Sequence, residues 1–88
     1  MSRRVPSVRY GQGIEVVPNP ASNIVKIRVQ RSGNYEMSLR DIRGRLLMRR
    51  EMKGSEIKLE LNDFAAGVYV IEVVSANESM MKLMNILR

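Results

Sequence analysis

The chain has 88 residues, which is enough for one small domain and not for two. Hydrophobic residues make up 44% of it and charged residues 27%, as in an ordinary globular domain. It contains no cysteine and no histidine, which excludes disulfides, thiolate or imidazole metal sites, and Ser–His or Cys–His catalytic pairs. We therefore expect no enzyme, no metal site and no cofactor.

The net charge of +6 is concentrated in two places. Three arginines lie in residues 1–13, and five arginines with a single aspartate lie in residues 40–50. Such clusters are typical of contact with phosphate-bearing partners, namely nucleic acid, anionic lipid or lipopolysaccharide, and also of a flexible leader and a solvated strand face. Nucleic-acid modules usually interleave basic residues with aromatic ones, which are few here, so we expect no nucleic-acid partner.

Residues 1–13 show no hydrophobic periodicity, which predicts a flexible linker. From Ile14 onward, apolar and polar residues alternate with the period of two that is typical of strands with one buried face. The last expected strand, rich in methionine and leucine, would also suit a short helix, but the polar hairpin before it favours a strand. The expected strands are Ile14–Val17, Ile24–Gln30, Tyr35–Arg40, Arg45–Glu51, Ile57–Leu61, Val68–Val74 and Met80–Leu87.

Turn-forming residues separate these segments. Pro18-Asn19-Pro20 cannot continue a strand ladder, because each proline lacks an N–H. Ser32-Gly33-Asn34, Arg43-Gly44 and Lys53-Gly54-Ser55 are typical hairpin turns. Val68–Val74 is apolar on both faces apart from Glu72 and is expected at the centre of a sheet. About seven short strands separated by turns predict an all-β fold, an Ig-like antiparallel β-sandwich.

Four motifs occur in a fixed order along the chain. They are VVPNPASN (Val16–Asn23), LRDIRGR (Leu39–Arg45), LELNDFAAGVY (Leu59–Tyr69) and MKLMNILR (Met81–Arg88). In this order and spacing the sequence resembles the type A C-terminal sorting domain of cargo proteins of the type IX secretion system of Bacteroidetes. The resemblance covers residues 14–88 and implies an Ig-like fold without chemistry of its own.

The resemblance implies that residues 14–88 are the sorting domain of a larger cargo protein, whose N-terminal part precedes them in the same chain. Its implied partners are an outer-membrane shuttle barrel and a cysteine-protease-like sortase, which usually cuts upstream of the domain and links the cargo to lipopolysaccharide. The linker, residues 1–13, would contain the cleavage region, from Val5 to Gly13. The implied location is the periplasm in transit, then the outer membrane, the cell surface or the medium.

The last strand is the expected recognition element, because an edge strand offers unpaired backbone groups for strand addition. A free edge also predicts homodimers formed by strand pairing or swapping. The residues expected to bind the translocon are Lys82, Leu83, Ile86, Leu87 and Arg88, with Asp41, Gly44 and Arg45 of the basic turn as a second candidate surface. The residues expected to hold the fold are Pro18, Asn19, Pro20, Asn23, Gly67 and Tyr69.

Two other classes of protein are also compatible with these patterns. One is a basic nucleic-acid-binding β-domain, whose binding would fall steeply with increasing salt. The other is a generic Ig-like or fibronectin-like cell-surface module that binds a protein or glycan, which has the same architecture. A patch of exposed aromatic side chains away from the last strand would favour that alternative.

Overall fold

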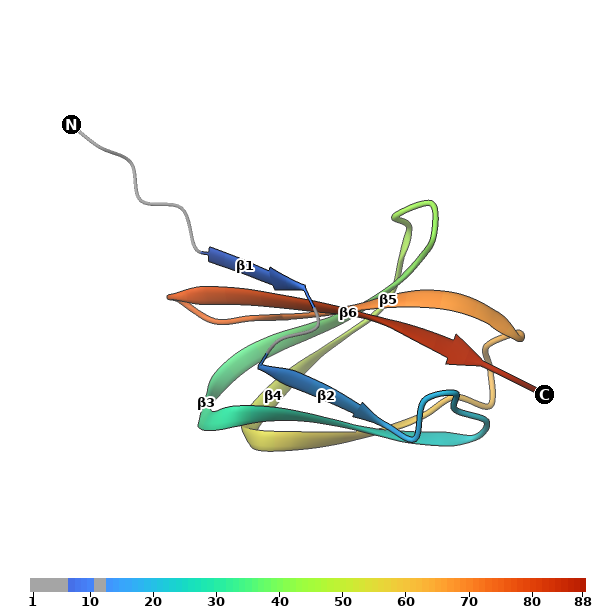
Figure 1. Ribbon diagram of the computed structural model, residues 1–88, viewed down its shortest axis with the longest axis horizontal. Helices are drawn as coiled ribbons and strands as arrows, with labels where there is room; N and C mark the ends of the chain where they lie inside the picture. Colours follow the sequence, from blue (N-terminus) through green and yellow to red (C-terminus); the bar gives the residue numbers. More distant parts are fainter. Residues whose placement is uncertain (1–6, 11–12) are drawn as a thin grey trace.

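The computed structural model describes residues 7–10 and 13–88, and every regular element in them is a β-strand (Figure 1). The strands are β1 (Ser7–Tyr10), β2 (Ile14–Val17), β3 (Ile24–Asp41), β4 (Leu46–Glu60), β5 (Gly67–Val74) and β6 (Glu78–Ile86). The all-β prediction is confirmed, and the C-terminal segment is a strand and not a helix. No helix in the described residues is long and apolar enough to cross a membrane.

β1 lies within the segment expected to be a linker, where no regular element was predicted. It pairs with β6 in parallel, with Arg9 opposite Met80. The rest of that segment up to residue 12, namely residues 1–6 and 11–12, lies outside the described residues. Of the predicted cleavage region, Val5 to Gly13, the structure therefore describes only Ser7–Tyr10 and Gly13.

From residue 14 onward there are five strands, not the seven that were predicted. β3 and β4 each span two predicted strands, and they pair with each other over nearly their whole length, with a register shift between Arg28 and Gly33. The turns predicted around Gly33 and Gly54 are wrong, because these two glycines face each other within the β3–β4 ladder. Glycine permits a bend or bulge there while the strands stay paired, and Gly54 has a φ of 104°. The predicted turn at Arg43-Gly44 is confirmed.

The strands form one curled sheet in the order β1-β6-β5-β3-β2, with β4 paired to β3. The first part of β3 pairs with β2 and the end of β4, and the second part pairs with β5 and the start of β4. The curl brings Ala21, just after β2, beside β6, where its N–H donates to the Asn85 carbonyl at 2.8 Å. The described strands thus form one continuous curled sheet, and the expected sandwich is not confirmed. The bent β3–β4 hairpin connects the part of the sheet that contains β2 with the part that contains β5 and β6 (Figure 1).

The core lies inside the curl. β5 pairs with β3 on one side and β6 on the other, so its predicted central position is confirmed. Tyr69, Ile71 and Val73 of β5 are buried, while the residues between them face outward. Burial of each large apolar side chain contributes about 1.5–3 kcal/mol. The fully buried large side chains are Val25, Ile27, Met37, Leu39, Met52, Leu61, Ile71, Val73, Met80, Met84 and Ile86.

Candidate functional site

The side chains of β6 divide between the core and the surface. Ile86 is fully buried in the core, so its side chain is not available to the translocon in the folded domain, contrary to the expectation for this residue. It alternates with exposed neighbours, since Leu83 is 62% exposed and Leu87 is 60% exposed. Lys82 is half-buried and pairs with Ile71 of β5. Of the predicted apolar contact residues, only Leu83 and Leu87 are available to a partner.

Arg88 is bound to the domain itself. Its guanidinium donates to the Phe64 carbonyl at 2.9 Å from Nη2 and 3.1 Å from Nε, and to Asn23 Oδ1 at 3.1 Å from Nη1. Nη2 also donates to the carbonyl of Leu61. The guanidinium presents five donors in one plane, which suits such a group of acceptors. Arg88 thereby ties the end of the chain to the loop after β4 and to Asn23, one of the residues expected to hold the fold.

Both edges of β6 have partners within the described residues, so the predicted free edge is wrong. β5 pairs with one edge, and β1 covers residues Glu78–Met81 of the other. Further along that second edge, the Asn19 side-chain amide donates to the Leu83 carbonyl at 3.2 Å and accepts from the Asn85 N–H at 3.1 Å. Asn19 stands between Pro18 and Pro20 in the exposed loop after β2, and its amide takes the place of a neighbouring strand.

The turn between β3 and β4 is organised by Asp41. Its Oδ1 accepts the N–H groups of Arg43 and Arg45, each at 2.9 Å. The hydrogen bond from the Arg45 N–H is the main reason that the pKa of Asp41 lies below its usual value. Gly44 has a φ of 89°, which favours glycine, and its carbonyl accepts from Arg40 Nη1 at 3.0 Å. Asp41 and Gly44 therefore shape the turn.

The exposed groups of this turn are the ones available for contact. The Arg45 side chain is mostly solvent-exposed, although its Nε lies 3.3 Å from Asp41 Oδ2. Arg43 is exposed, and Ile42 is 73% exposed. The turn projects beyond the sheet (Figure 1). Sequence reasoning did not select Ile42 or Arg43, although both lie within the motif Leu39–Arg45.

The structure places Leu83 of the last strand on the same face as Arg40, which lies next to the basic turn. Arg40 of β3 pairs with Leu46 of β4 and with Val70 of β5, which in turn pairs with Leu83 of β6. We define the outer apolar face as Leu46, Val68, Val70 and Leu83; three of these are exposed and Val70 is half-buried. The basic turn, residues 41–45 between β3 and β4, lies next to this face. The signal for it was the run Val68–Val74, whose outward apolar residues were interpreted only as a sign of a central strand.

Gly67 and Tyr69 hold the loop before β5. The Tyr69 hydroxyl donates to the Ala65 carbonyl at 2.6 Å, and its ring meets Phe64 edge-on with a centroid distance of 6.1 Å. Gly67 has a φ of 154° at the start of β5. These contacts are local and internal, which fits the structural role expected for both residues.

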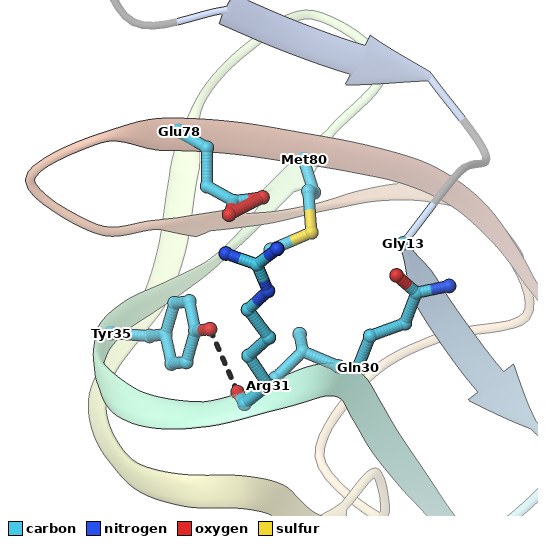
Figure 2. A pocket seen from close by; sticks show the side chains of 7 residues that line it. Gly13, Gln30, Arg31, Tyr35, Glu78 and Met80 are labelled. Atoms are coloured by element: carbon cyan, nitrogen blue, oxygen red, sulfur yellow. Dashed lines mark hydrogen bonds between the residues drawn. The ribbon is translucent and has the colours of Figure 1, made fainter.

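Figure 2 shows a small pocket where β6 begins, lined by Gly13, Val29, Gln30, Arg31, Tyr35, Glu78 and Met80. Its volume is about 40 Å³, which is room for a few water molecules. The Tyr35 hydroxyl donates to the Arg31 carbonyl at 2.8 Å. Among the described residues there is no group of three or more acidic, histidine or cysteine side chains that could hold a metal. Within residues 13–88 the aromatic side chains are buried or half-buried, so this part of the chain has no exposed aromatic patch.

Comparisons with known proteins agree with this architecture. The family described as the secretion system C-terminal sorting domain matches residues 15–86. Among solved structures, the chain is similar to PorZ, an essential bacterial surface component of the type-IX secretion system of Porphyromonas gingivalis. The sequences are 26% identical and the TM-score is 0.75, with 86% of this chain and 12% of the PorZ chain covered. No curated protein matches.

The family match spans most of the chain and includes all of β2 to β6 except Ile14. It gives the domain the role of a C-terminal signal for export toward the outer membrane, the cell surface or the medium. The chain belongs to the family of C-terminal sorting domains of the type IX secretion system.

Proposed function

We propose that this domain directs a cargo protein preceding it in the same chain through the type IX translocon, and that the outer apolar face with the basic turn is the surface that the translocon recognises. The observation that carries the proposal is the exposure of Leu83 on β6, in register with Val70 and Arg40. An apolar patch rimmed by arginines is typical of a protein-binding site. The domain itself performs no chemistry in this proposal.

The partners in this proposal are the outer-membrane shuttle barrel and the sortase-like protease. The cargo passes through the periplasm, and the protease then cuts between Val5 and Gly13 and links the cargo to lipopolysaccharide. Support for a cut in this segment comes from its position ahead of the family match, which begins at residue 15. Proteases require an extended substrate, which such a segment can provide when it is unpaired.

A reporter fusion tests the sorting role. Residues 1–88 are fused to the C-terminus of a periplasmic reporter in a Bacteroidetes strain with, and in one without, type IX function. Export only in the competent strain, with loss of most of the fused 10.1 kDa segment on processing, supports the proposal. A folded reporter that stays in the periplasm of both strains refutes it.

The recognition surface is tested with a matched pair of variants in the same fusion. Leu83→Glu places a charge in the outer apolar face and is expected to reduce export severalfold. Ile24→Glu is the control, because Ile24 is also an exposed strand residue, 46% exposed, and lies away from that face. Equal export of the two variants would exclude the outer apolar face as the recognised surface.

Homodimerisation by strand pairing or swapping is also part of the proposal, with β4 as the pairing edge. In the described residues β4 pairs only with β3, so its other edge is open along Leu46–Glu60. Open edges favour pairing between copies. Sedimentation of the isolated domain over a range of concentrations tests this, and a monomer throughout would refute it.

A further inference from the structure

The second edge of β6 is covered by two segments of different kinds. The part near Asn85 is closed by Asn19 and by Ala21, which is buried in the core. The part at Glu78–Met81 is closed by β1, a strand of four residues that pairs with no other strand of the described chain. A short ladder of this kind opens locally at a far lower free energy than the core strands do.

The edge toward which each β6 backbone N–H and C=O points shows which of these groups β1 covers. The Leu87 N–H donates to Ala21 at 2.9 Å, and the Asn85 N–H donates to Asn19, so odd-numbered residues direct their backbone groups to this edge. Because alternate residues share a direction in a strand, Ser79 and Met81 direct theirs to β1. In the parallel register, Ser7 lies opposite Glu78 and Arg9 opposite Met80, so both Ser7 and Arg9 direct their N–H and C=O groups to β6, and Arg9 lies between Ser79 and Met81.

We propose that the β6 edge at Ser79–Met81 is an acceptor site for an extended peptide strand of a partner protein, running parallel to β6, and that β1 occupies this site in the free domain. The inference rests on the proposed function, because it assigns a strand-binding partner to the recognition strand β6. The orientation follows from β1, which shows that a parallel strand fits here. Since the edge holds one strand at a time, partner binding displaces β1 and releases Ser7–Tyr10, which lies in the predicted cleavage region.

The pocket of Figure 2 adjoins this acceptor edge. Glu78 and Met80 of β6 line it from one side, and Gln30 and Arg31 of β3 line it from the other. The Arg31 side chain points toward β6 in this view. A partner strand on the edge therefore lies next to both the Arg31 guanidinium and the Glu78 carboxylate, which favours a polar side chain in the bound peptide.

Amide hydrogen exchange in the full 88-residue chain tests whether β1 covers the edge. Arg9→Pro removes the N–H that faces β6, and Arg9→Ala is the matched control that keeps it. We expect the amides of Ser79 and Met81 to exchange about tenfold faster in Arg9→Pro than in Arg9→Ala. The amide of Met84, which faces β5, serves as the internal reference and is expected to stay unchanged. Equal exchange at Ser79 and Met81 in the two variants would overturn the proposal.

Peptide binding tests whether the uncovered edge accepts a strand. The probe is a fluorescein-labelled peptide with the sequence of residues 5–12, and the control peptide carries proline at the position of Arg9. The probe is expected to bind the Arg9→Pro chain at least tenfold more tightly than the wild type, where β1 competes at high effective concentration. The control peptide is expected not to bind.

A disulfide gives an independent closed state, because the chain has no cysteine of its own. Tyr10→Cys with Met81→Cys joins two residues that pair in the β1–β6 ladder. Once oxidised, this variant is expected to lose peptide binding even when Arg9→Pro is added, and reduction is expected to restore it. Binding that is unchanged by oxidation, or absent from the Arg9→Pro chain, would refute the acceptor site. The reporter fusion reads the sorting role separately, so export with no peptide binding would remove the acceptor site alone.

Discussion

Replacing Arg88 by methionine separates a stabilising role of this residue from a role in recognition. The change keeps the apolar stem and removes the hydrogen bonds to Phe64, Leu61 and Asn23. Hydrogen bonds to a charged group contribute about 1.5–3 kcal/mol when they are shielded from water. Most of these are exposed, so water replaces part of their energy, and we expect a net loss of about 1–2 kcal/mol.

Equilibrium urea unfolding and thermal unfolding measure this loss. For a domain of this size, each 1 kcal/mol lowers the melting temperature by about 4–8 °C. Arg88→Lys should lose nearly as much, because a compact ammonium group cannot reach acceptors that a planar guanidinium bridges. Arg43→Met is the control, since Arg43 is exposed on the turn, and its unfolding free energy should change by less than about 0.5 kcal/mol.

The result that refutes this reasoning is an Arg88→Met variant as stable as Arg43→Met. If such a variant were also exported poorly in the reporter fusion, Arg88 would act by contacting the translocon, as its sequence position first indicated. Lower stability with export in proportion to the folded fraction would instead leave Arg88 a purely structural residue.

Three further variants test the core, the loop before β5 and the basic turn. Ile86→Ala should lower the free energy of unfolding by about 2–5 kcal/mol, because it opens a cavity in the core. The control Leu87→Ala, at an exposed position, should lower it by less than about 0.5 kcal/mol. Equal losses in urea unfolding would contradict the buried position of Ile86. Tyr69→Phe removes the hydroxyl bonded to Ala65 and should cost about 1 kcal/mol in the same assay, whereas no change would mean that this bond contributes nothing. Asp41→Asn should be less stable than the wild type at neutral pH, and the difference should shrink as the pH falls below the usual aspartate pKa of 3.8. The sign follows because the folded-state pKa of Asp41 is lowered, so its stabilisation is present above the unfolded pKa and is lost as pH falls through the folded pKa; a difference that does not change with pH would refute it.

The turns show where local sequence signals are sufficient. At Arg43-Gly44 the glycine and the Asp41 side chain close the turn by themselves, and the prediction is correct. At Gly33 and Gly54 the same kind of residues bend a continuous hairpin. The difference is that Gly33 and Gly54 lie opposite each other in the β3–β4 ladder. This pairing joins segments that are distant in sequence, so no local residue pattern indicates it.

The last strand shows the same limit for the candidate site. Period-two alternation identified β6 and its two faces, but not which edge had a partner. Asn19 lies far from Asn85 in the sequence, and β1 lies in a segment without periodicity. No sequence pattern therefore predicted that Asn19 and β1 would cover the second edge of β6. Arg88 was expected to contact a partner because it is basic and near the end of the motif, whereas its acceptors are brought to it only by folding.

The all-β class, the inward and outward faces of most strands, and the family could be predicted from the amino-acid sequence, because side-chain alternation and motif spacing are properties of the local chain. Three features became visible only in the folded domain: β3 and β4 are each one bent strand, the β6 edge is covered, and Leu83 shares a face with Arg40. These features depend on pairing between segments that are distant in sequence. Their free energy comes from burial and backbone hydrogen bonds formed only when the sheet curls closed.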